Sequence, residues 1–143
     1  MQKLKGIDGK LDDICRELCK ERSDWICEKC GLEFPERKGW GIQWSHLWGR
    51  RARATRWDMD NCVAHCTGYH SYLGANPHEF SLWIENHLGE TLRDQVRLRF
   101  NQPKKFYKAE KQEMLDHYKS ELDRIKKLRK DGQKGRIEVV NWF

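Results

Sequence analysis

The sequence predicts an α+β fold in which a small metal-centred core lies between two helical segments. Residues 8–22 repeat apolar side chains every three to four positions, which is typical of an amphipathic helix. Residues 42–48 alternate polar and apolar side chains, as a half-buried strand does. Cys27 and Cys30 have the spacing of a metal knuckle. We therefore expect three parts: an N-terminal packing helix over residues 1–24, a core over 25–89 and a basic helical extension over 90–143.

The N-terminal helix carries two of the six cysteines. Cys15 and Cys19 lie one turn apart on its apolar stripe. Small thiols at this spacing are usually core side chains rather than metal ligands, so we interpret them as packing residues.

Residues 25–31 predict a short strand that enters a tight knuckle. Thiolates at Cys27 and Cys30 can reach one tetrahedral ion, and Gly31 permits the turn. A redox pair has the same spacing, but no βαβ pattern surrounds it. The stretch therefore predicts half of a zinc site.

Helical patterns fill the second half of the chain. Asn76-Pro77 starts one helix and Gly89 ends it, residues 90–100 form a shorter helix, and residues 104–130 form a long one with a basic outer face. The long helix docks on the core, pairs with a second copy or lies along DNA, and the sequence leaves these three open. Residues 136–143 alternate, which predicts a terminal edge strand or a docking peptide.

Positive charge is concentrated in one part of the chain. The 143 residues have a net charge of +6 and a mean hydropathy of −0.96. Residues 37–57 contain no acidic side chain but six basic ones: Arg37, Lys38, Arg50, Arg51, Arg53 and Arg56. Such a cluster indicates a polyanionic partner, with nucleic acid favoured over an acidic membrane.

The sequence shows no membrane or export signal. Its apolar runs are far shorter than the roughly 20 residues of a membrane span, and its first residues lack the apolar core of a signal peptide. We expect a cytoplasmic protein without a membrane partner. In that compartment the cysteines indicate metal binding or buried thiols rather than disulfides.

The stretch from Gln43 to His70 places His46, Asn61 and His70 in the order of a known family. It resembles the HNH (ββα-metal, His-Me finger) endonucleases, and is most similar to phage recombination nucleases of the NinG/Rap type. The similarity covers roughly residues 25–85. It is carried by Cys27-x-x-Cys30-Gly31, Ser45-His46, Gly49-Arg50, Thr55-Arg56-Trp57, Asn61, Cys66 and Asn76-Pro77.

This resemblance implies a ββα-metal core with a zinc knuckle and metal-dependent hydrolysis of DNA phosphodiester bonds. His46 would be the general base, Asn61 would tie the preceding loop to the strand, and His70 would bind the catalytic ion. That ion would be Mg²⁺ or Mn²⁺, with Zn²⁺ and Ni²⁺ as further candidates, beside a structural Zn²⁺.

The resemblance also implies the partner. The substrate would be double-stranded DNA or a branched recombination intermediate, cut by a monomer or a homodimer in the host cytoplasm if the protein is phage-encoded. The phosphate-binding candidates are Arg50, Arg51, Arg53 and Arg56, whose guanidinium groups can bind phosphate oxygens in pairs. The resemblance places Arg50 and Arg56, whereas for Arg51 and Arg53 a solvated position on the surface stays open.

The chain departs from the family pattern at the zinc site. Cys27, Cys30 and Cys66 match, but Tyr69 stands where a fourth cysteine is expected. Structural zinc prefers four nitrogen or sulfur ligands. The candidates for the missing ligand are Cys62, His65 and His70.

A second departure lies beside the general base. Ser45 stands where many of these enzymes have an acid or histidine that binds the catalytic ion. Because a hydroxyl is a poor ligand, we expect weak metal binding without DNA, with His78 as a weaker additional candidate.

Two other functions remain open at this stage. The main alternative is a noncatalytic zinc-containing DNA-binding module, in which His70 completes the zinc site and His46 packs. A protein-binding adaptor that uses the long basic helix is the third.

Overall fold

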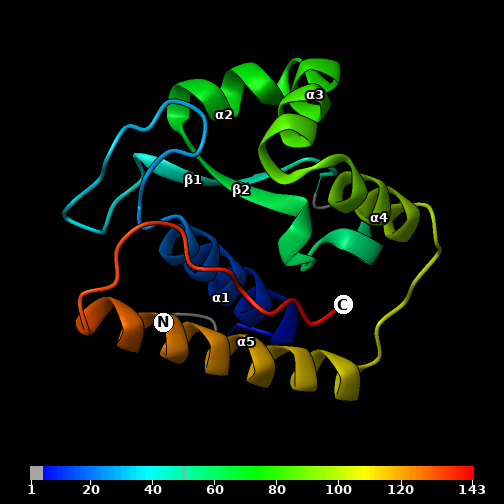
Figure 1. The fold of residues 1–143 in the computed structure, drawn as a ribbon. Helices are drawn as coiled ribbons and strands as arrows, with labels where there is room; N and C mark the ends of the chain where they lie inside the picture. Colours follow the sequence, from blue (N-terminus) through cyan, green and yellow to red (C-terminus); the bar gives the residue numbers. More distant parts are fainter. Residues whose placement is uncertain (1–4, 50) are drawn as a thin grey trace.

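The sheet is a two-stranded antiparallel hairpin at the centre of the molecule (Figure 1). The computed structural model describes residues 5–49 and 51–143. Strand β1 (Ile42–His46) pairs with strand β2 (Cys62–Cys66), with Ile42 opposite Cys66 and His46 opposite Cys62. Helix α2 (Thr67–Gly74) follows β2 directly and contacts both strands. The chain therefore forms a strand–strand–helix unit around residues 42–74.

Strand β2 lacks the alternation of polar and apolar side chains by which the sequence predicts β1. Cys62, Val63, Ala64 and His65 are all buried. Adjacent side chains of a strand point to opposite faces, and both faces of this sheet are covered by helices (Figure 1). A strand buried on both sides shows no alternation of polar and apolar residues.

Helix α1 (Ile7–Arg22) lies between the sheet and helix α5 (Lys108–Lys130), so the three form successive layers (Figure 1). Apolar side chains of both helices join those of the sheet in the main core. The long helix therefore docks on the domain and is not a free arm. Neither α5 nor any other described helix is apolar enough over a sufficient length to cross a membrane.

The start of α5 also differs from the expected one. It begins at Lys108 rather than Lys104, because Phe106 is buried in the main core just before it.

A second, smaller core covers the other face of the sheet. It is formed by Val63, Leu73, Phe80 and Ile84. These side chains come from β2, α2 and helix α3 (Pro77–Leu88), which ends at Gly89 with φ 98°. Helix α4 (Glu90–Phe100) follows, as the sequence predicts.

The last eight residues form an extended segment rather than the predicted terminal strand. Their backbone runs along α1 and α5 (Figure 1), and it pairs with no strand of the described chain. The amide of Ile137 donates to the carbonyl of Arg22, 3.0 Å away, at the end of α1. Trp142 and Phe143 pack against the main core. The segment is thus the docking peptide that the sequence offered as the other interpretation.

Tyr118 of α5 joins three segments of the main core. Its fully buried hydroxyl lies 2.6 Å from the carbonyl oxygen of Trp57 and 2.9 Å from Oδ1 of Asn141. It therefore links α5, the chain before β2 and the C-terminal segment.

Replacing Tyr118 with phenylalanine should lower the free energy of unfolding by about 1–3 kcal/mol, because the buried carbonyl of Trp57 is left without its donor. Urea titration followed by circular dichroism measures it. Tyr72→Phe is the matched control, since that hydroxyl bonds to Glu79 at an exposed position and should cost at most about 0.5 kcal/mol. Equal values for the two variants would contradict this role of Tyr118.

Candidate functional site

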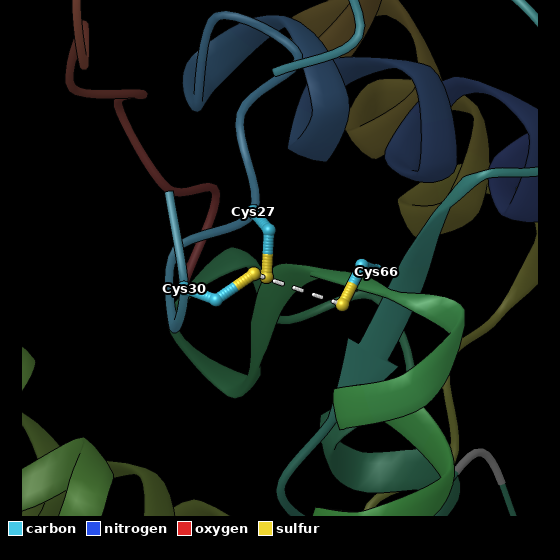
Figure 2. A group of neighbouring side chains, drawn as sticks. All are labelled: Cys27, Cys30 and Cys66. Carbon is cyan, nitrogen blue, oxygen red and sulfur yellow. Dashed lines mark hydrogen bonds between the residues drawn. The ribbon is translucent and has the colours of Figure 1, made fainter. Parts of the chain in front are cut away.

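Three cysteines from distant parts of the chain come together in one group. The sulfur atoms of Cys27, Cys30 and Cys66 all lie within 4.8 Å of one another (Figure 2). Cys27 and Cys30 come from the knuckle after α1, and Cys66 ends β2. This group can hold a metal ion such as zinc.

The sulfur separations fit a tetrahedral zinc site. A Zn–S bond of about 2.3 Å gives a sulfur–sulfur separation of about 3.8 Å at the tetrahedral angle. Sγ of Cys30 and Sγ of Cys66 are 3.9 Å apart, and all three cysteines are free of disulfide bonds. A disulfide would need about 2.05 Å. This separation is compatible with two thiolates that share one zinc ion.

Backbone contacts fix the knuckle against β2. Gly31, with φ 77°, turns the chain so that its amide donates to the carbonyl of Cys27 at 2.8 Å. The amide of Glu28 donates to the carbonyl of Ala64, and the amide of Ala64 donates to Oε2 of Glu28. These bonds set the distance between the knuckle and the end of β2, where Cys66 lies.

The surroundings of Cys27 favour the thiolate that a metal requires. Burial opposes ionisation, but backbone amides of Cys66, Cys30 and Lys29 point at the sulfur and lower the pKa of Cys27 below its usual value. Stabilising a thiolate by amide donors is one of the ordinary ways of preparing a metal ligand.

The structure does not bring any of the predicted fourth ligands to the three thiols. Sγ of Cys62 lies in the main core, 3.6 Å from Nη2 of Arg22. His65 points to the opposite face of β2, where burial lowers its pKa to about 4 and its ring packs against Phe80 and Trp83. Neither side chain, nor that of His70, belongs to the metal-binding group found among the described residues.

His46 and His70 line one pocket of about 390 Å³. His46 ends β1, and His70 lies in the second turn of α2. The residues that line this pocket come from α1, β1 and α2 and from the chain on either side of β1. The His pocket is lined by Arg16, Lys20, Trp40, Ile42, Gln43, Trp44, His46, Gly49 and His70.

Gln43 orients His70. Oε1 of Gln43 accepts a hydrogen bond from Nδ1 of His70, which leaves Nε2 of that ring without a proton. Burial lowers the pKa of His70, so the ring is neutral at physiological pH. A neutral imidazole whose other nitrogen donates to an oxygen is the usual state of a metal-binding histidine.

His46 is held through Nε2, whereas His70 is held through Nδ1. Its Nε2 lies 3.3 Å from the carbonyl oxygen of Arg56, and its ring meets that of Trp44 edge-on at 4.1 Å. With Nε2 as donor, Nδ1 carries the lone pair. In its neutral form each of the two rings therefore has one nitrogen with a lone pair.

Asn61 ties the loop between β1 and β2 to itself. It is buried, and its Oδ1 accepts from the amide of Trp48 at 2.9 Å. Its Nδ2 donates to the carbonyls of Trp48 at 2.8 Å and Thr55 at 3.0 Å. The side chain binds both ends of the segment 48–55, which contains three of the four predicted phosphate-binding arginines, and it does not line the His pocket.

The arginines have different surroundings. Arg50 lies outside the described residues, and Arg51 and Arg53 are exposed beside a second pocket. Arg56 instead forms a two-pronged ion pair with Asp12 of α1, at 3.0 and 2.6 Å. Its guanidinium group stabilises the packing of the loop on α1.

Sequence patterns missed the cations of the His pocket. Arg16 and Lys20 line it from α1, where the stripe of apolar residues indicated only packing. The guanidinium of Arg16 also lies over the ring of Trp44, 5.6 Å from its centre. Their spacing of four residues is compatible with one helix face, but only the packing of α1 against β1 shows that this face reaches His46.

Neither Ser45, which replaces a metal ligand of the family, nor the weaker candidate His78 lines the His pocket. Ser45 is fully buried, its hydroxyl has no hydrogen-bond partner among the described residues, and it does not line that pocket. His78 is exposed in the first turn of α3 and does not line it either. No carboxylate is among the described lining residues.

Comparisons with protein-family models, curated proteins and solved structures find no match. The function must therefore be argued from the residues and their geometry.

Purified protein should contain zinc that depends on the cysteine group. Cys66→Ser removes one of three thiolates and should abolish stoichiometric zinc, measured by mass spectrometry of metal content. Cys62→Ala is the control and should retain the ion, because that thiol lies in the main core. Equal zinc in wild type and Cys66→Ser would contradict the site, and loss in Cys62→Ala would make Cys62 the fourth ligand.

Proposed function

We propose that the protein is a metal-dependent endonuclease of the HNH type that hydrolyses DNA phosphodiester bonds. The observation that carries the proposal is the shared pocket of His46 and His70, which are remote in sequence. The chain order supports it as well: His46 ends β1, Asn61 immediately precedes β2, and His70 lies in α2. Strand, strand and helix in this order are what the resemblance implies.

His46 is the proposed general base. Because the carbonyl of Arg56 accepts from Nε2, the lone pair is on Nδ1, which can take a proton from water. The water oxygen then bonds to phosphorus while the bond from phosphorus to the 3′ oxygen breaks, and the leaving oxygen is protonated from solvent. Proton removal by a positioned imidazole typically contributes about 10²–10⁴-fold in rate.

His70 is the proposed ligand of the catalytic ion. The donor set fits such an ion in part: Nε2 of His70 is free of its proton and the ring is held by Gln43, but no carboxylate lines the described pocket. The remaining ligands would be phosphate oxygens and water. When bound, Mg²⁺ or Mn²⁺ would neutralise charge on the nonbridging and leaving oxygens.

Arg16 and Lys20 support a phosphate substrate. Both are cationic side chains on α1 at the His pocket. Burial and the neighbouring charge of Arg16 lower the pKa of Lys20, so an anion in the pocket would relieve an unfavourable pair of positive charges. We assign them to holding the scissile phosphate.

A noncatalytic zinc-containing DNA-binding module is the second candidate. The missing carboxylate and the buried Ser45 favour it, because both reduce the donors available to a catalytic ion. The separation of His70 from the three thiols does not favour it, since the module was expected to use His70 for zinc. Action on branched recombination intermediates and a homodimer rest on the resemblance alone.

Loss of His46 should abolish cleavage but not binding. With Mg²⁺ or Mn²⁺ present, His46→Ala should nick supercoiled plasmid about 10²–10⁴-fold more slowly than wild type, with DNA affinity changed less than about twofold. His78→Ala is the control, because this histidine is exposed and outside the pocket. Cleavage by His46→Ala at the wild-type rate would contradict the role of His46 as general base. Absence of cleavage from both proteins would support the DNA-binding module.

Loss of Gln43 should weaken the catalytic ion rather than the base. Gln43→Leu removes the acceptor that orients His70, and should raise the Mn²⁺ concentration for half-maximal nicking about 10–100-fold. The rate at saturating Mn²⁺ should fall much less. Gln95→Leu, at an exposed position of α4, makes the same change away from the site. An unchanged Mn²⁺ dependence in Gln43→Leu would exclude this positioning role.

A further inference from the structure

A second pocket, of about 570 Å³, is lined by four basic side chains and no acidic one among the described residues. It lies between the loop before β2 and the linker from α4 to α5. We call it the basic pocket. Its lining residues are Arg51, Ala52, Arg53, Ala54, Phe100, Asn101, Gln102, Pro103, Lys104 and Lys105.

The two walls are held together by contacts at the end of α4. The ring of Phe100 stacks on that of Trp48, with centres 4.1 Å apart and planes 14° apart. Arg99 forms ion pairs with Asp58 at 2.6 Å and Asp60 at 3.3 Å, between η1 (Arg53–Thr55) and β2. These contacts place the linker beside the loop although the two are about fifty residues apart in sequence.

The positive charge of the basic pocket is largely uncompensated. Lys104 lies 3.4 Å from Glu110, an exposed pair of the kind that contributes little. Arg51, Arg53 and Lys105 make no ion pair with any described residue. Two neighbouring arginines, Arg56 and Arg99, form ion pairs within the protein. The four basic side chains that line the basic pocket therefore remain for an external anion.

The basic pocket is connected to the His pocket through one short loop. Asn61 binds Trp48 at one end of this loop and Thr55 at the other, with Arg51 and Arg53 between them. The carbonyl of Arg56, the next residue, receives the hydrogen bond of His46. Arg51 and Arg53 therefore belong to the same segment whose next part orients His46.

We propose that the basic pocket binds the phosphate backbone of DNA beside the scissile bond, with Lys104 and Lys105 as contacts supplied by the α4–α5 linker. This rests on the proposed function for the identity of the polyanion. Four cations from two walls, spread over one open pocket, suit successive phosphates of a strand better than a single small anion. The linker lies outside the part of the chain that resembles the nucleases.

The test is the salt dependence of DNA affinity in the full chain. Lys104→Ala/Lys105→Ala should weaken binding of a fluorescent 20-base-pair duplex and reduce the slope of log affinity against log salt by about two units, one for each phosphate that is no longer neutralised.

Lys119→Ala/Lys127→Ala is the matched control, because it removes the same charge from exposed positions of α5. An equal slope in the two double variants, or a wild type that does not bind the duplex, would overturn the proposal. A reduced slope in the linker variant together with a wild type that never cleaves would uphold the basic pocket and reject the nuclease. Normal cleavage by the wild type, together with an unaltered salt slope in the linker variant, would uphold the nuclease and reject the basic pocket.

Discussion

The side chain of Asn61 is the constraint on which the arrangement of both pockets depends. A buried amide can make several hydrogen bonds, and here it makes three, all to the backbone of one loop. A buried polar group stabilises a structure only when it is satisfied, and these bonds hold Trp48 and Thr55 together through the side chain of Asn61. The loop then presents the carbonyl of Arg56 to His46 and carries Arg51 and Arg53 outward. A residue that touches neither pocket thus sets the geometry of each.

Strand β2 connects this loop to the cysteine group. Asn61 lies before its first residue, Cys66 is its last, and His70 follows within the next helix. Strand β2 alone therefore separates Asn61, which holds the loop, from Cys66 of the cysteine group. A two-stranded hairpin is marginal by itself, so the helices on its two faces and an ion bound by Cys27, Cys30 and Cys66 would stabilise it together.

Helical periodicity was enough to predict most of the fold, and tertiary context explains where it failed. The repeat of large apolar residues located α1, α3, α4 and most of α5, because one buried face leaves a regular pattern. It missed β2, whose residues are buried on both faces. For residues 136–143 the sequence allowed either a strand or a docking peptide, since alternating side chains occur in any extended chain with one buried side.

The sequence predicted some candidate site residues correctly by position but not by role, and it missed others. Arginines in one loop look alike in sequence, yet Arg56 is paired with Asp12 while Arg51 is exposed. Arg16 gave no signal, because its position at the His pocket follows from how α1 packs against β1.

The charge of the His pocket has a consequence for the order of binding if the protein is a nuclease. Arg16, which is also paired with Asp13 at 3.0 Å, and Lys20 bring positive charge to the pocket, and no carboxylate is among its described lining residues. A phosphate that enters the pocket neutralises these cations and adds oxygen ligands beside Nε2 of His70. Each partner therefore raises the affinity for the other, and by linkage the two effects must be equal in free energy. An ion bound weakly in the free protein and firmly with DNA is then a property of the charge distribution around His46 and His70, with no change of fold required.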